Sequence, residues 1–249
     1  MKIVMLGTGT GVPVKERGCA GIYVHAGGQH ILLDAGPGTA RQLVKLGVTY
    51  LTLDAIFLTH FHVDHCLDFV ALLFAMYIPD PARTKPLTIY GPRGLKQLYR
   101  ELNHAFHGWI TPRSYELTLK ELGDETVKLK DVTVRAVPMH HSTDAVGYRV
   151  ESKGKSVVYS GDTDYCANIV RLGRRADMLI LECSMPDERK VAGHLTPSEC
   201  GRIAAEADCR HLVLTHFYPV FKGYDIRSRV RRAFRGRVTL ARDLSSFTL

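Results

Sequence analysis

The chain has 249 residues, of which 45 % are hydrophobic and 23 % are charged, a composition typical of globular proteins. Its length suits one sizeable domain or two small ones. No apolar run approaches the roughly 18 residues needed to cross a bilayer, so we expect no membrane-spanning helix. The formal net charge of +8 favours anionic partners such as phosphates or nucleic acid.

Short apolar runs typical of strands alternate with amphipathic stretches typical of helices. Glycine and proline are scattered as turn residues and no linker interrupts the pattern, so we expect a single domain over residues 1–249. The predicted strands cover residues 2–6, 30–34, 54–59, 87–90, 132–137, 145–151, 155–160, 177–182 and 211–215. The predicted helices cover residues 38–46, 66–77, 92–105, 164–172, 196–207 and 225–234.

The first predicted strand lacks the small-residue cleavage site of a signal peptide, and we expect a cytoplasmic protein. The cysteines form no CxxC pair and no dense secreted framework, which predicts free thiols packed as small apolar residues. They are Cys19, Cys66, Cys166, Cys183, Cys200 and Cys209.

The run His60-Phe61-His62-Val63-Asp64-His65 carries the strongest chemical signal of the chain. It follows a predicted strand and precedes an apolar helix, so we expect it to form a turn. Imidazole nitrogens and a carboxylate at this density suit zinc, manganese or iron. A turn can point the first two histidines one way and Asp64 and His65 another, which serves two adjacent ions better than one.

Two ions need further ligands, and three residues at predicted strand ends could supply them. His141 and Asp162 each follow a predicted strand, and His216 ends the run 212–216. That run resembles residues 56–60, because both are apolar segments ending in Thr-His. Two similar halves packed face to face would bring both terminal histidines into one cleft.

Two other groups of residues allow two interpretations each. His104 and His107 share a predicted helix face, which we expect to be a packing or lid segment; the alternative is a substrate rim with Trp109 and Tyr77. Six arginines gather near the C-terminus, either as the solvated face of a helix or as a contact for an anionic partner. They are Arg227, Arg229, Arg231, Arg232, Arg235 and Arg237.

The HxHxDH run, the later histidine, the Gly161-Asp162-Thr163 turn and the final Thr-His resemble the metallo-β-lactamase superfamily, and more narrowly its ribonuclease Z branch. The resemblance implies an α/β fold of four layers, αββα, with two mixed β-sheets flanked by helices. Further segments similar to that branch are residues 7–17, 33–43, 89–95, 179–182 and 194–196.

The resemblance also implies a ligand set for two divalent ions, with zinc expected and manganese or iron as alternatives. His60, His62 and His141 would bind one ion. Asp64, His65 and His216 would bind the other, and Asp162 would bridge the two. His141 is preferred to its neighbour His140 because it stands six residues before Gly147-Tyr148, as in the family pattern. Asp34 would orient a ligating histidine, or would merely cap its own turn.

Such a pair of ions would activate a bridging hydroxide for attack on a phosphodiester. The departing alkoxide then needs a proton, for which His194 is the expected general acid and Glu182 the group that orients it. The alternative is that His194 merely precedes the helix capped by Thr196. Asp64, His194 and Glu182 are therefore the expected catalytic residues.

The sequence also departs from the ribonuclease Z pattern. Members that process tRNA precursors commonly carry a long arm between the third-motif histidine and the bridging aspartate. Here the corresponding segment, residues 142–161, is filled by two predicted strands. Gly18 stands where asparagine is usual, Val63 where glycine is usual, and no Ser or Arg of the usual kind follows His216. These departures count against tRNA 3′-end processing.

We therefore expect an arm-less phosphodiesterase that acts on a small or flexible anionic substrate, a nucleotide or an RNA end. The first alternative is hydrolysis of a carboxylic ester, lactone, thioester or sulfate ester at the same metals. A second alternative, from another class, is a nucleic-acid-binding protein without turnover, and redox use of the metals lacks any flavin signal. A homodimer is the common state of the relatives that the chain resembles.

Overall fold

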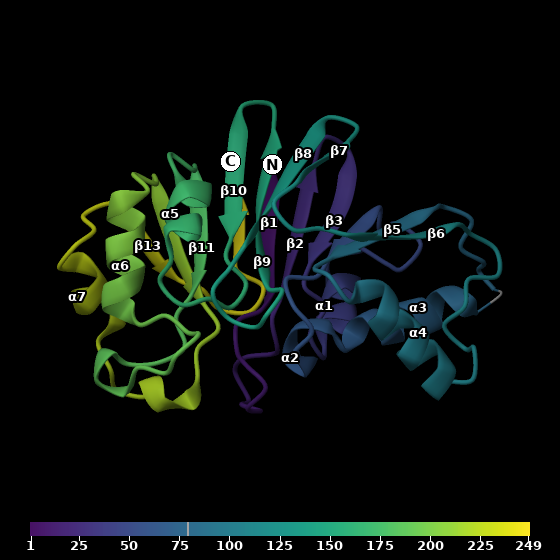
Figure 1. Ribbon diagram of the computed structural model, residues 1–249, viewed down its shortest axis with the longest axis horizontal. Helices are drawn as coiled ribbons and strands as arrows, with labels where there is room; N and C mark the ends of the chain where they lie inside the picture. Colours follow the sequence, from purple (N-terminus) through teal and green to yellow (C-terminus); the bar gives the residue numbers. More distant parts are fainter. Residues whose placement is uncertain (79) are drawn as a thin grey trace.

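The structure is a computed structural model that describes residues 1–78 and 80–249. In this part of the chain the strands form two mixed sheets that face each other, with helices on both outer sides (Figure 1). The two chain ends lie together, because the amino group of Met1 donates to the carbonyl of Leu249 at 3.1 Å. This four-layer order confirms the predicted αββα architecture.

The N-terminal sheet has the order β14-β1-β2-β3-β4-β5-β6 in the described residues. Strands β3 to β6 run parallel, whereas β14, β1, β2 and β3 pair antiparallel. Its strands are β1 (Lys2–Gly7), β2 (Gly21–Ala26), β3 (Gln29–Leu33), β4 (Ala55–Phe57), β5 (Leu87–Gly91), β6 (Leu117–Glu121) and β14 (Ser246–Thr248).

The C-terminal sheet has the order β13-β12-β11-β10-β9-β8-β7 in the described residues. Strands β10 to β13 run parallel, and β7 to β10 pair antiparallel. Its strands are β7 (Thr126–Leu129), β8 (Val132–Pro138), β9 (Val146–Ser152), β10 (Lys155–Tyr159), β11 (Met178–Glu182), β12 (His211–Thr215) and β13 (Arg237–Leu240).

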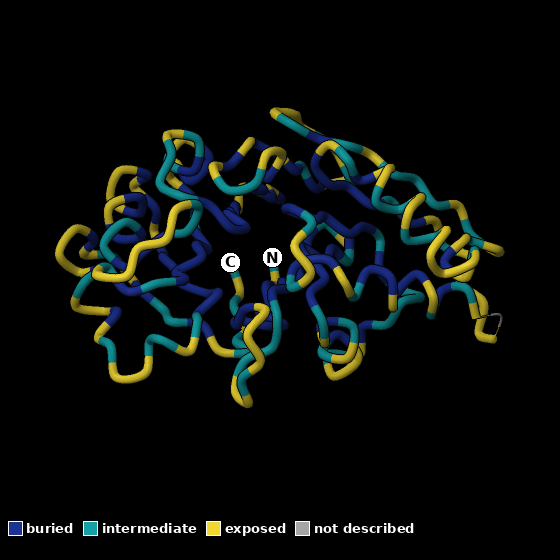
Figure 2. Tube along the Cα trace, turned by 60° about the horizontal axis from the view of Figure 1, so that its bottom comes forward, coloured by how far each residue is buried: buried dark blue, intermediate teal, exposed yellow. Residues whose placement is uncertain are grey.

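One apolar core lies between the sheets, and one more lies under each helix layer. Burial is therefore deepest in the strands, and exposure is greatest on the outer helices and loops (Figure 2).

The single-domain organisation stays a prediction. The helices are α1 (Thr39–Lys45), α2 (Val63–Cys66), α3 (Asp68–Tyr77) and α4 (Leu95–Ala105) on one side, and α5 (Ala167–Gly173), α6 (Pro197–Glu206) and α7 (Ile226–Arg231) on the other.

The prediction of one continuous helix over residues 66–77 was wrong, and so was the prediction of a simple turn before it. Val63 to Cys66 already form α2, and α3 begins only at Asp68. The backbone N–H of Asp68 donates to the carbonyl of Ala35 at 2.7 Å. This bond to the segment after β3 interrupts the helix, and it leaves Asp64 and His65 inside a helical turn.

Every predicted strand is present, but five strands were missed. β6 and β7 are half-exposed segments with threonine and lysine among their residues, and β14 is a three-residue edge strand. Such strands take their conformation from the neighbouring strand more than from their own pattern. β2, the central strand among those missed, begins with Gly21 and ends in a turn at Gly27, which obscured it. The fifth is β13.

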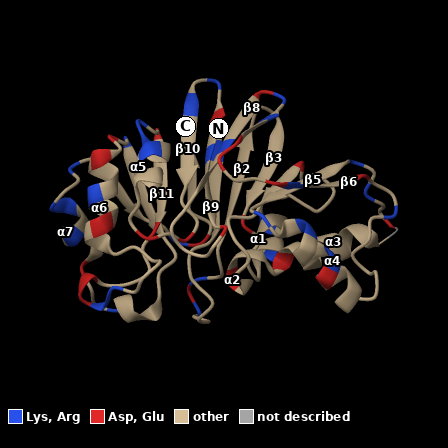
Figure 3. Cartoon of the chain, viewed as in Figure 1, with Lys and Arg blue, Asp and Glu red and all other residues tan. Residues whose placement is uncertain are grey.

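Three further predictions can be compared with the described residues. All six cysteines are free, as predicted. No helix among these residues is long and apolar enough to cross a membrane. The arginine-rich run begins on α7, at the edge of the molecule (Figure 3), where Ile226 and Val230 face the core and Arg229 pairs with Glu188 at 2.7 Å. This placement agrees with a solvated helix face, and the contact for an anionic partner stays the alternative.

Candidate metal centre

Loops that follow the strands of both sheets meet at one end of the sandwich. Asp162 comes after β10 and His216 after β12, and these strands are parallel to β11 between them, so both residues lie at the same sheet edge. Gly161 has a φ of 58°, and a Cβ there would lie 2.6 Å from the Cβ of Thr59. Only glycine lets the two loops approach so closely, and that approach places Asp162 beside His60.

Two groups of potential metal ligands converge here, and a third combination, Asp162, His194 and His216, shares two of their members. His60, His62, His141 and Asp162 form the first, with their donor atoms all within 4.8 Å of one another. Nε2 of His141 lies 3.1 Å from Nδ1 of His62, and Nε2 of His60 lies 3.9 Å from Oδ2 of Asp162.

The second group is Asp64, His65 and His216. Nε2 of His216 lies 3.1 Å from Nε2 of His65 and 3.3 Å from Oδ2 of Asp64. Asp162 stands between the groups, because its Oδ1 is 3.3 Å from Nε2 of His65 while its Oδ2 faces His60 and His141 at 3.9 Å. The structure thus brings together all seven residues expected to bind metal.

Two buried atoms at the centre are left without a hydrogen bond. Among residues 1–78 and 80–249, Nε2 of His60 and Oδ1 of Asp162 are both in this condition. Buried polar atoms are seldom left unpaired, because an unsatisfied group costs about 1–3 kcal/mol. A cation between these donors would satisfy both atoms, so the residues fit divalent metal ions.

The other ring nitrogen of several histidines is held by the protein. Nδ1 of His60 lies 3.0 Å from Oγ1 of Thr59, and Nδ1 of His141 lies 2.8 Å from the carbonyl of Gly193. Nδ1 of His216 lies 3.0 Å from Oγ of Ser184. These contacts fix each ring with Nε2 toward the centre, as metal-binding imidazoles require.

Asp34 holds a fourth imidazole ring, that of His65. One carboxylate oxygen, Oδ2, lies 2.8 Å from Nδ1 of His65 and accepts from the hydroxyl of Tyr159 at 2.9 Å. Its Oδ1 accepts from the backbone N–H of Thr59 at 2.7 Å. Asp34 is fully buried and therefore orients a ligand residue from inside the fold, as the resemblance implied.

Glu182 and His194 form a pair at the edge of the centre. Nδ1 of His194 lies 3.0 Å from Oε1 of Glu182, and the same oxygen accepts from the backbone N–H of Thr163 at 2.9 Å. Nδ1 of His194 is also 3.8 Å from Oδ2 of Asp162. The capping box of Thr196 and Glu199 is present and fixes the start of α6 directly after His194.

Burial and charge act against each other at this centre. Burial, with a further contribution from the neighbouring imidazole of His65, lowers the pKa of His60 well below its usual value. At His65 burial has the same effect, but the carboxylates of Asp162 and Asp34 outweigh it and raise the pKa well above usual. Burial would raise the pKa of Asp162, yet His216 and His65 hold it well below the usual range. The hydrogen bond that His194 donates to Glu182, together with the charge of that carboxylate, likewise outweighs burial and raises the pKa of His194.

Sequence reasoning separated the relevant histidines from their neighbours. His140 is exposed and belongs to neither group, whereas His141 belongs to the first. His104 and His107 also lie outside the metal-ligand groups of the described chain. Trp109 packs on Tyr77, with ring centroids 5.2 Å apart, which agrees with a packing segment.

Ser184 is a residue that sequence reasoning missed. Its hydroxyl donates to Oε2 of Glu182 and contacts Nδ1 of both His216 and His194, at 3.0 and 3.3 Å. It therefore connects one carboxylate to two imidazoles. The available signal was its spacing, two residues after Glu182 at the end of a buried strand.

Comparison with known proteins agrees with this geometry. Residues 29–217 match the family described as "Beta-lactamase superfamily domain". Ribonuclease Z from Methanosarcina mazei is 32% identical, with 87% of each chain covered, and ribonuclease Z from Myxococcus xanthus is 29% identical, with 87% of this chain and 86% of the relative covered.

Solved structures show the same relationship. The metallo-β-lactamase fold protein YhfI from Bacillus subtilis superposes with a TM-score of 0.85 at 25% identity, covering 99% of this chain and 98% of its own. The short form of human tRNase Z superposes with a TM-score of 0.80 at 25% identity, covering 100% and 99%. The chain therefore belongs to the β-lactamase superfamily. Within that superfamily it belongs to the ribonuclease Z family, and it is a metal-dependent hydrolase of the phosphodiesterase type.

Proposed function

We propose that the chain is a dinuclear phosphodiesterase that acts on a small or flexible anionic substrate, a nucleotide or an RNA end. The observation that carries the proposal is the Glu182–His194 pair set against Asp162, 3.8 Å from Nδ1 of His194. A proton donor beside a metal centre is what an alkoxide leaving group needs. Hydrolysis of activated esters needs it less.

His60, His62 and His141 would hold one ion, with Asp162 shared between the two. Asp64, His65 and His216 would hold the other. Two ions so placed lower the pKa of a shared water and stabilise charge on the phosphoryl oxygens. Imidazole with carboxylate suits zinc, and manganese and iron also accept this donor set.

The remaining chemistry belongs to the protein's own groups. Glu182 accepts a hydrogen bond from Nδ1 of His194, which leaves Nε2 as the atom that can give a proton to the departing oxygen. Ser184 donates to the other oxygen of the same carboxylate, Oε2 of Glu182, and its hydroxyl also contacts Nδ1 of His216. Asp34 keeps His65 in one ring orientation, so neither ligand has to reorganise when substrate binds.

The segment between His141 and Asp162 limits the choice of substrate. Residues 142–161 are all described, and they contain β9, β10 and short connections. No arm protrudes from this segment, which supports a small or flexible substrate over a folded tRNA.

The cytoplasmic location and the homodimer stay predictions.

The test is turnover of bis(p-nitrophenyl) phosphate by purified protein loaded separately with zinc and with manganese. We expect turnover that a chelator stops and that added metal restores. Protein that holds two metals yet leaves this substrate intact, while hydrolysing a lactone or thioester, would refute the phosphodiesterase. Salt-sensitive RNA binding without any turnover would instead support the binding protein.

A further inference from the structure

A groove of about 850 Å³ lies between three loops, those that follow β1, β12 and β13. Binding sites for small molecules have volumes of about 300–1,000 Å³, so the groove is large enough for a nucleotide. The lining residues that matter below are Arg17, Phe217, Tyr218, Phe221, Lys222 and Arg242.

Tyr218 connects the groove to the metal centre. Its ring centroid lies 5.9 Å from that of His216 and 6.4 Å from that of His194. A phosphodiester at the centre could therefore extend one of its two substituents past Tyr218 into the groove. Tyr218 therefore lines the groove and also borders the metal centre.

The wall of the groove is aromatic. Phe217 and Phe221 meet edge to face at 5.8 Å, and Phe221 meets Tyr224 in the same way at 5.6 Å. The guanidinium of Arg17 lies 4.6 Å from the ring centre of Phe217 and donates to Oγ1 of Thr8 at 2.6 Å. Phe221 is half-buried, so part of its ring stays accessible to a flat ligand.

Two cations of the groove are unpaired. Lys222 and Arg242 are exposed, and neither forms an ion pair with any residue in the described ranges. Asp243, a carboxylate of the same groove, is occupied with the backbone N–H groups of Thr8 and Gly18, at 2.9 and 2.7 Å. Glu16, a second carboxylate of the groove, is exposed, so Arg17, Lys222 and Arg242 exceed the two carboxylates by one charge. The groove therefore offers two unpaired cations and a small excess of positive charge beside aromatic rings.

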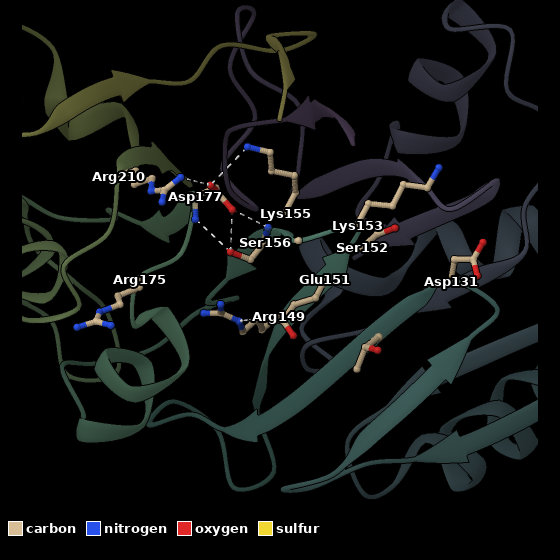
Figure 4. Close-up of a pocket in the computed structure, with 12 residues that line it drawn as sticks. Asp131, Arg149, Glu151, Ser152, Lys153, Lys155, Ser156, Arg175, Asp177 and Arg210 are labelled. Carbon is tan, nitrogen blue, oxygen red and sulfur yellow. Dashed lines mark hydrogen bonds and ion pairs between the residues drawn. The ribbon is translucent and has the colours of Figure 1, made fainter.

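A second basic pocket differs from this groove in its lining. It measures about 410 Å³ and includes the turn between β9 and β10 (Figure 4). There Arg149 pairs with Glu151 at 2.7 Å, and Arg210 pairs with Asp177 at 2.9 Å. Its five cations outnumber its three carboxylates, so it too is positively charged, but its lining has no aromatic ring.

We propose that the groove beside the metal centre binds the nucleoside that stays on the scissile phosphate. Its base stacks on Phe221, and Lys222 and Arg242 hold the next phosphate of the substrate. Aromatic rings beside cations are the usual means of binding single-stranded nucleotides without base selection. The inference rests on the proposed function and narrows its substrate class to oligonucleotide ends.

The experiment uses three substrates with the same p-nitrophenyl leaving group. They are methyl p-nitrophenyl phosphate, thymidine 5′-(p-nitrophenyl phosphate) and the latter with an added 3′-phosphate. The variants are Phe221→Leu and Lys222→Gln in the metal-loaded full chain. The controls are Phe106→Leu and Lys153→Gln, which remove an exposed ring and an exposed charge elsewhere. Melting temperature and bound metal are measured for all four.

Phe221→Leu should lower kcat/KM for both thymidine esters, relative to the methyl ester, by roughly fivefold to 150-fold, the effect of losing one stacked base. Lys222→Gln should lower kcat/KM only for the substrate with the 3′-phosphate, by about two- to fivefold, and less at high salt. Ratios that stay unchanged while all three substrates are turned over would overturn the groove proposal alone. No turnover of any of the three by wild-type protein holding two metals would overturn the proposed function and, with it, the groove.

Discussion

The two sheets contribute to the metal centre in different ways. The N-terminal sheet delivers four donors from one short segment after β4, residues 60–65, and Asp34 supports them from the neighbouring strand end. The C-terminal sheet delivers its donors singly, from loops after different strands, and Ser184 and Gly193 support them. The first half of the centre is therefore a local motif, and the second depends on the register of parallel strands.

This difference predicts which substitutions are severe. Loss of Asp162, which both groups of metal ligands share, should remove both ions. Loss of Asp34 or Ser184 should weaken only the ligand that each supports, His65 or His216. The supporting groups also differ in strength. Asp34 is a buried carboxylate in direct contact with its imidazole, and Ser184 is a neutral hydroxyl between Glu182 and His216.

The largest effect is expected at Asp162, which stands between the two groups of metal ligands. Asp162→Asn keeps the shape of the side chain but removes the charge that both groups share, so metal should be lost and turnover should fall to background. Bound metal by mass spectrometry and turnover of bis(p-nitrophenyl) phosphate measure both. Asp131→Asn, at the exposed start of β8, is the matched control. Two bound metals with normal turnover would exclude a bridging role.

His194→Ala should separate proton donation from metal binding. The metals should stay, because the seven expected ligands supply both ions without His194, although His194 also lies in a third group with Asp162 and His216. Substrates with poor leaving groups should slow by about 10²–10⁴-fold, and those with p-nitrophenyl leaving groups much less. His140→Ala, an exposed histidine next to the centre in sequence, should change neither. An equal loss on both kinds of substrate would remove the general-acid role.

The contrast between the halves also explains what the sequence could reveal. The HxHxDH run is local, so its density alone indicated a metal site. His141, Asp162 and His216 were identified only together with the family resemblance, because a single polar residue at a strand end is seldom a ligand. The order of the strands in the two sheets, and the edge strands β6, β7 and β14, depend on long-range pairing that no local pattern records.

Ser184 was missed for a related reason. Serine after a buried strand is ordinarily a turn residue, and its role appears only when β11 and β12 lie side by side with Glu182 next to Thr215. Asp34 was identified only because the family resemblance implied a carboxylate that supports a ligand in this turn. The sequence and the resemblance thus predicted which residues meet at this centre, but not most of the contacts that hold them there.

Asp34→Asn tests the support of the N-terminal half. The amide can still occupy the site, but it cannot accept from His65, Thr59 and Tyr159 as a carboxylate does. We expect metal affinity to fall by about 10–100-fold, as for other groups that orient a ligating imidazole. Competition with a chelator of known affinity measures the change. If affinity is unchanged while the melting temperature falls, Asp34 acts only as a turn cap.

Ser184→Ala tests the C-terminal half and should have the smallest effect. It removes one neutral hydrogen bond to His216, worth about 1 kcal/mol, so affinity for one of the two ions should fall about fivefold. Ser184→Thr keeps the hydroxyl and should restore it, whereas a loss of packing alone would not be restored in this way. A loss as large as that of Asp34→Asn would mean that Glu182 acts on His216 through this hydroxyl with the strength of a direct carboxylate contact. His65 and His216 would then depend equally on a buried carboxylate, although only His65 contacts its carboxylate, that of Asp34, directly.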